Sequence, residues 1–132
     1  MNKSVKQFLG FTVLTASLTA ASVAFAQDKT LTDGVFTEAQ ASAGAAVYDS
    51  NCKSCHDMKF YENTLKSWNS QPLIYLWETI MGTMPADNPG SMMFEEYTDV
   101  LAYILSENGF PAGEAPLDHN GGMDTISIVP PE

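Results

Sequence analysis

The chemistry of this 132-residue sequence is concentrated in one pentapeptide, Cys52-Lys53-Ser54-Cys55-His56. Cysteines at positions i and i+3 lie on one side of a helical turn, so their sulfurs can reach one edge of a flat ligand together. The spacing Cys-x-x-Cys-His is the attachment pattern of c-type haem, in which two thiols add to the porphyrin vinyl groups and the histidine binds the iron. We therefore predict one haem c, bonded to Cys52 and Cys55, with His56 as the proximal iron ligand.

Three other kinds of site use a Cys-x-x-Cys pair, and the first two have a sequence feature against them. A thioredoxin-like dithiol needs a strand–helix–strand pattern. The chain after residue 26 has only four Val and five Ile, which do not alternate with polar residues. A zinc site would have to recruit the distant His119, and adjacent Cys55 and His56 are awkward as joint tetrahedral ligands. A plain disulfide between the two cysteines is the third alternative.

A second axial ligand is expected from a methionine, because ferrous haem iron favours a soft thioether. Met84 precedes Pro85 and directly follows a segment with helical spacing. Proline holds the preceding residue in an extended conformation, which fixes the direction in which the loop leaves the helix. We predict Met84 as the sixth ligand. The alternatives are Met92 or Met93, and a site that is vacant or ligated by His119.

The charge balance restricts the kinds of partner. The chain has six lysines, no arginine and 16 acidic residues, for a net charge of −10. Nucleic acids and anionic membrane surfaces attract cationic proteins, so neither is expected to bind. A hydrophobic fraction of 45% is ordinary for a globular domain, which argues against wholesale disorder.

Residues 1–26 have the pattern of a secretory signal peptide. Lys3 and Lys6 form a positive start, an apolar run follows over residues 8–23, and Ala24-Phe25-Ala26 offers a small-x-small cleavage site. An uncleaved anchor helix is the alternative, although the run is short for a membrane span. We therefore expect a periplasmic protein whose mature chain has no membrane span.

Helical spacing of apolar residues predicts an all-α domain over residues 27–109. Thr37 and Gln40 form a capping-box pattern at the start of the first helix, and Pro72 is well placed at the start of the second. Three main helices are expected, over about residues 37–50, 72–82 and 94–108.

The last segment, residues 110–132, holds seven Pro or Gly in 23 positions. Such a composition does not support a helix, so we expect an extended tail that packs on the domain. Its apolar residues are the expected anchors: Leu117, Met123, Ile126 and Ile128.

Aromatic residues are expected around the haem. Phe60, Tyr61 and Trp68 follow the pentapeptide and are expected to cover the haem edge, where Tyr61 or Trp68 can hydrogen-bond a propionate. Ordinary core packing is the alternative for all three. A further set, from the second and third helices, is expected to line the haem: Leu73, Leu76, Trp77, Ile80, Val100, Leu101 and Ile104.

Together these parts resemble the class I single-haem cytochromes c over residues 36–109. The resemblance rests on the pentapeptide, residues 37–48 before it, Thr83-Met84-Pro85, Asn88-Pro89-Gly90-Ser91 and Val100-Leu101-Ala102-Tyr103-Ile104-Leu105. It implies a cytochrome c fold, in which the first and last helices cross with Gly44 and Tyr48 against Tyr103. Residues 108–113 are similar to those of cytochromes that accompany quinoprotein-type dehydrogenases.

The chain departs from that family directly after the pentapeptide. The family has a loop with Gly and Pro there, and one of its backbone carbonyls accepts a hydrogen bond from the proximal imidazole. Residues 57–71 contain neither Gly nor Pro, so the usual acceptor for the His56 ring is not apparent in the sequence.

The predicted function is the transfer of single electrons through the covalent haem, without enzyme activity. A site closed by His56 and Met84 has no open position for a substrate. The alternatives are a dedicated haem subunit of a periplasmic dehydrogenase, docked through residues 110–132, a haem sensor or peroxidase with an open sixth position, and a thiol oxidoreductase.

Charge is distributed unevenly along the sequence. Lys53, Lys59 and Lys66 surround the pentapeptide, whereas residues 67–132 hold ten acidic residues and no lysine. Because charge asymmetry steers encounters, we expect the acidic side to meet a redox partner with a basic docking patch, while the haem edge near Lys53 makes the electronic contact. A uniformly solvated acidic surface is the alternative.

Overall fold

The computed structural model describes residues 28–130, and the predicted signal peptide, residues 1–26, lies outside them. The elements follow in the order β1 (Lys29–Thr30), η1 (Leu31–Asp33), α1 (Glu38–Asn51), α2 (Met58–Ser67), α3 (Leu73–Thr83), α4 (Phe94–Glu107), η2 (Met123–Thr125) and β2 (Ile126–Ser127). The all-α architecture is confirmed, because each strand has only two residues. Within residues 28–130, no helix combines the length and the apolar character needed to cross a membrane.

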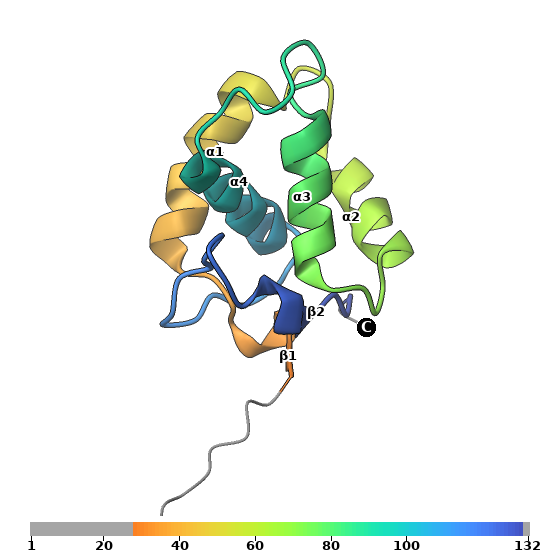
Figure 1. Ribbon diagram of the computed structural model, residues 1–132, viewed down its shortest axis with the longest axis vertical. Coiled ribbons are helices and arrows are strands. Elements are labelled where there is room, and N and C mark those ends of the chain that lie inside the picture. Colours follow the sequence, from red (N-terminus) through yellow and green to blue (C-terminus); the bar gives the residue numbers. More distant parts are fainter. Residues whose placement is uncertain (1–27, 131–132) are drawn as a thin grey trace, which may run out of the picture.

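The main packing contact of the fold is the crossing of α1 and α4 (Figure 1). Gly44 lies at the crossing point, where an added Cβ atom would be 1.9 Å from the backbone oxygen of Asp99. On the same side of α1, the ring of Tyr48 packs against Tyr103 with centroids 5.3 Å apart. The crossing that the family resemblance implies is therefore present, and the missing side chain at Gly44 permits it.

The first helix begins with the capping box that the sequence predicts. The Gln40 backbone N–H donates to the Thr37 hydroxyl at 3.2 Å, and the Thr37 N–H donates to the Gln40 side-chain oxygen at 3.3 Å. The same Gln40 amide also exchanges two hydrogen bonds of 2.8 Å with the backbone of Leu117. One side chain thus caps α1 and holds the C-terminal segment beside it.

A fourth helix, α2, follows the pentapeptide, where the sequence analysis expected no helix. Asp57 is its N-cap, and the Asp57 carboxylate accepts the Phe60 backbone N–H at 2.9 Å. Tyr61 and Leu65, one helical turn apart, are its buried residues. An Asp cap followed by apolar residues at i and i+4 is the sequence signal that was available for this helix.

The C-terminal segment is part of the core. Its four expected anchors are all buried: Leu117, Met123, Ile126 and Ile128. β2 pairs in parallel with β1, and the Ile128 N–H donates to the Gln71 carbonyl at 2.9 Å (Figure 1). The segment therefore ties the start of the domain to the loop before α3.

Replacement of Gly44 by Ala should destabilise the haem-loaded protein by about 2–3 kcal/mol, because the new methyl group forces α1 away from the backbone of α4. Gly82→Ala is the matched control, since no atom lies within 4 Å of a Cβ added at Gly82. The control should be neutral or slightly stabilising, as Ala favours a helix. Denaturant unfolding of both variants measures this, and equal effects would refute the close-crossing argument.

Candidate haem site

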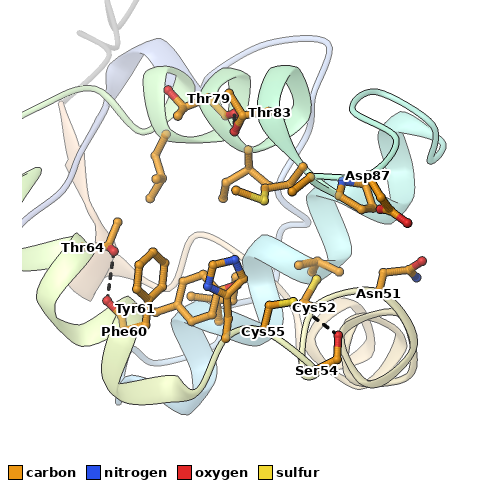
Figure 2. Close-up of a pocket in the computed structure, with 18 of the residues that line it drawn as sticks. Asn51, Cys52, Ser54, Cys55, Phe60, Tyr61, Thr64, Thr79, Thr83 and Asp87 are labelled. Carbon is orange, nitrogen blue, oxygen red and sulfur yellow. Dashed lines mark hydrogen bonds between the residues drawn. The ribbon is translucent and has the colours of Figure 1, made fainter.

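A cavity of about 840 Å³ opens between α3 and the junction of α1 with α2 (Figure 2). Thr79 and Thr83 lie along one wall, and Cys52, Cys55 and Tyr61 lie along the wall that faces it. The volume falls within the roughly 300–1,000 Å³ that is usual for small-molecule and cofactor sites.

The pentapeptide forms a tight turn directly after α1. The Cys52 N–H donates to the Tyr48 carbonyl at 2.9 Å, and the N–H groups of Cys55 and His56 both donate to the Cys52 carbonyl, at 3.1 and 3.0 Å. The Tyr48 hydroxyl donates to the His56 carbonyl at 2.6 Å. This turn brings both free thiols and the imidazole to the same cavity.

Aromatic rings surround the imidazole of His56. Its centroid lies 4.5 Å from that of Phe60, with 33° between the rings, and 5.7 Å from that of Tyr61. Because α2 begins immediately after His56, these rings come from the first turn of a helix. Among the described residues, no hydrogen bond from the His56 ring to a backbone carbonyl is present, so ring packing orients it.

Met84 reaches the cavity from the end of α3. It is extended, with φ −124° and ψ 152°, as the following Pro85 predicts, and its N–H donates to the Ile80 carbonyl at 2.8 Å. Met84 lines the cavity together with the pentapeptide, whereas the alternative ligands Met92, Met93 and His119 do not.

The structure separates the four aromatic residues predicted at the haem. Phe60, Tyr61 and Trp68 line the cavity, but Trp77 does not. The indole N–H of Trp77 donates to the Thr98 hydroxyl at 3.1 Å, and its ring stacks on His119 with 12° between the planes. Trp77 therefore belongs to the packing between α3, α4 and the C-terminal segment, and His119 is packed against it.

The apolar lining is also smaller than expected. Leu73 and Leu101, like Trp77, are buried in the core away from the cavity, and the other four members of the predicted set line it: Leu76, Ile80, Val100 and Ile104.

These residues fit a covalently held haem. The walls carry more apolar than polar surface, two free thiols stand three residues apart on one of them, and an imidazole and a thioether line the same space. This donor set matches the chemistry of haem c, in which Cys52 and Cys55 would attach the porphyrin and His56 and Met84 could bind its iron. Within residues 28–130, no three His, Cys, Asp or Glu side chains converge on an alternative metal site.

A family model described as "Cytochrome C oxidase, cbb3-type, subunit III" matches residues 39–104, half of the chain. The chain belongs to this family of c-type cytochromes. The match runs from α1 into α4 and includes the pentapeptide and Met84. Neither a curated protein nor a solved structure matches the chain. Membership implies covalently bound haem c, electron transfer and redox partners, and it supports the cytochrome c fold.

The cytochrome also places hydroxyl groups around the cavity, which sequence reasoning missed. Thr64, Ser67, Thr79 and Thr83 all line it, and each hydroxyl donates to a backbone carbonyl within its own helix. Such hydroxyls keep acceptor capacity on their oxygens while their protons remain satisfied. The sequence signal for these hydroxyls was their spacing, three residues in α2 and four in α3, which places each pair on one face of its helix.

Burial and local ion pairs set the electrostatics of the cytochrome. Burial raises the pKa of the Cys52 thiol, which disfavours the thiolate that a redox dithiol needs. Burial also raises the pKa of the Tyr61 hydroxyl well above its usual range, so this hydroxyl stays protonated. Lys53 pairs with Asp49 at 2.9 Å, and Lys66 pairs with Glu62, so local ion pairs neutralise two of the three lysines around the pentapeptide.

The hydrogen bond from Tyr48 to the His56 carbonyl should be worth about 1–2 kcal/mol, because its loss leaves a part-buried carbonyl without that donor. Tyr48→Phe should lower the free energy of unfolding of the holoprotein by that amount. Tyr103→Phe is the control, since the Tyr103 ring packs on Tyr48 but its hydroxyl has no hydrogen bond among the described residues. Urea titration compares them, and equal losses would contradict the role given to the Tyr48 hydroxyl.

Proposed function

We propose that this cytochrome is a periplasmic carrier of single electrons, with haem c on Cys52 and Cys55 and with His56 and Met84 on its two faces. The observation that carries the proposal is that the cavity is lined by the pentapeptide and by Met84 together, while Met92, Met93 and His119 stay outside it. The periplasmic location rests on the signal-peptide pattern of residues 1–26.

The geometry supports a carrier better than an enzyme. When bound, the haem supplies a ferric–ferrous couple. With His56 and Met84 both bound to the iron, no open position would remain for a substrate, and apolar residues such as Ile80 and Val100 would exclude water from the site. The Tyr48 hydroxyl holds the His56 backbone, and Phe60 in the first turn of α2 packs on the His56 ring.

A second candidate is a haem subunit of a larger electron-transfer complex. The description of the matched family, which names a subunit of an oxidase, favours it. The expected route of docking, through the tail, has little support, because Leu117, Met123 and Ile128 are buried in the domain's own core. A partner would have to bind another surface, and co-purification with a larger protein would favour this candidate over a free carrier.

Optical spectra test the proposal. Protein made with a cytochrome c maturation system should keep its colour after denaturation, because the haem is covalently bound. The ferric form should show the weak sulfur-to-iron band, and the ferrous form should bind carbon monoxide slowly. Met84→Ala should lose the band and bind carbon monoxide rapidly, whereas Met93→Ala, whose residue is 64% exposed, should behave like the wild type. Colourless protein with free thiols would end the haem assignment, and retention of the band in Met84→Ala would end the ligand assignment.

We further propose that the redox partner has a basic docking patch. Acidic residues support this. Asp87 lies beside the cavity (Figure 2). Glu95 and Glu96 are in the first turn of α4. The nearby Lys53 is already paired with Asp49. Attraction between opposite charges speeds association and is screened by salt.

The rate of electron exchange with a basic redox protein should therefore fall as ionic strength rises. Asp87→Asn should reduce both the rate at low salt and the salt dependence, because it removes a charge beside the cavity. Glu38→Gln is the matched control, since Glu38 is at the opposite end of α1 from Cys52. Stopped-flow measurements compare the variants, and a rate that does not depend on salt would refute the proposal.

A further inference from the structure

We propose that Tyr97 is the positioning residue of the sixth ligand, because its hydroxyl fastens the backbone of Met84 to α4. This inference rests on the proposed function, in which Met84 binds the haem iron. Tyr97 does not line the cavity, so its action is on the loop that presents the ligand.

The contact is made at the end of a helix. α3 ends at Thr83, and the last carbonyl groups of a helix lack partners within the helix. The Met84 carbonyl accepts a hydrogen bond of 2.7 Å from the Tyr97 hydroxyl and a longer one of 3.3 Å from the Gly90 N–H. Tyr97 therefore provides the shorter of two bonds that hold the backbone of the ligand residue.

Tyr97 is itself held rigidly. Its side chain is 1% exposed and belongs to the main core cluster. Its N–H donates to the Met93 carbonyl at 3.1 Å, and the Glu96 carboxylate accepts the Met93 N–H at 2.8 Å, which secures the first turn of α4. The Tyr97 hydroxyl therefore holds the Met84 backbone at a fixed position relative to α4.

The loop between Met84 and α4 makes few backbone hydrogen bonds. Between Met84 and α4, the backbone hydrogen bonds within the loop are those from Asn88 to the Pro85 carbonyl, at 2.9 Å, and from Gly90 to Met84. Asp87, Asn88 and Gly90 are exposed. Met92, near the end of the loop, packs against the core cluster, and the bond to Tyr97 connects the Met84 end of the loop to the core.

This arrangement controls how easily an external ligand can replace Met84. An added ligand binds the ferric iron only in the fraction of molecules in which Met84 has moved away, so its apparent affinity rises in proportion to that fraction. The Tyr97 bond exists only with Met84 in place. Its loss should raise the open fraction about fivefold, as expected for one net hydrogen bond.

The test uses Tyr97→Phe in the haem-loaded protein, because Phe keeps the ring and removes only the hydroxyl. The ferric variant should bind imidazole about fivefold more tightly than the wild type. Tyr75→Phe is the matched control, since Tyr75 is 51% exposed on α3 and its hydroxyl has no hydrogen bond among the described residues. Imidazole affinity in the control should not change. A tyrosine that only stabilised the fold would lower the unfolding free energy and leave this affinity unchanged.

An imidazole affinity equal to that of the wild type in Tyr97→Phe would overturn the inference. If that variant does not fold, NMR of the reduced wild-type protein tests the inference instead. The Tyr97 hydroxyl proton should give a slowly exchanging signal, and absence of this signal would overturn the inference. If the proposed function is wrong, the wild-type protein itself will lack the sulfur-to-iron band. That result is distinct from an unchanged imidazole affinity in Tyr97→Phe.

Discussion

The close crossing of α1 and α4 at Gly44 is the constraint on which the site depends. α1 leads directly into the pentapeptide, and α4 contributes Val100 and Ile104 to the back of the cavity. A side chain at Gly44 would collide with the backbone of Asp99 and separate the two helices. The width of the cavity is thus tied to a contact that lies outside it, since packed helices cannot shift independently of the segments they carry.

Two tyrosine hydroxyls link this helix pair to the two residues proposed as iron ligands. Tyr48 on α1 donates to the backbone carbonyl of His56 at 2.6 Å, and Tyr97 on α4 donates to that of Met84 at 2.7 Å. Both rings are buried. Each helix of the crossing therefore holds one of these residues by its backbone carbonyl, which leaves the side chain free to turn toward a bound haem.

The proximal side shows how a departure from the family pattern is compensated. Where related proteins have a loop with Gly and Pro, this chain starts α2 at once, and Phe60 and Tyr61 pack around the His56 ring. A helix can present such residues on one face, close to the residue that precedes it. The C-terminal segment is fastened to the domain in a similar way. The Gln40 side chain, at the start of α1, exchanges two hydrogen bonds with the backbone of Leu117.

Local pattern alone determined the pentapeptide, the extended Met84 before Pro85, the capping box at Thr37 and the three main helices, because each depends on residues close together in the chain. Tertiary structure decided the rest. Trp68 and Trp77 have the same side chain, yet only Trp68 lines the cavity. Tyr97 reaches Met84 across 13 residues, and Gln40 reaches Leu117 across 77. Such partners come together only when the helices pack. Because hydrophobic packing is non-directional, no residue spacing in the sequence predicts these contacts.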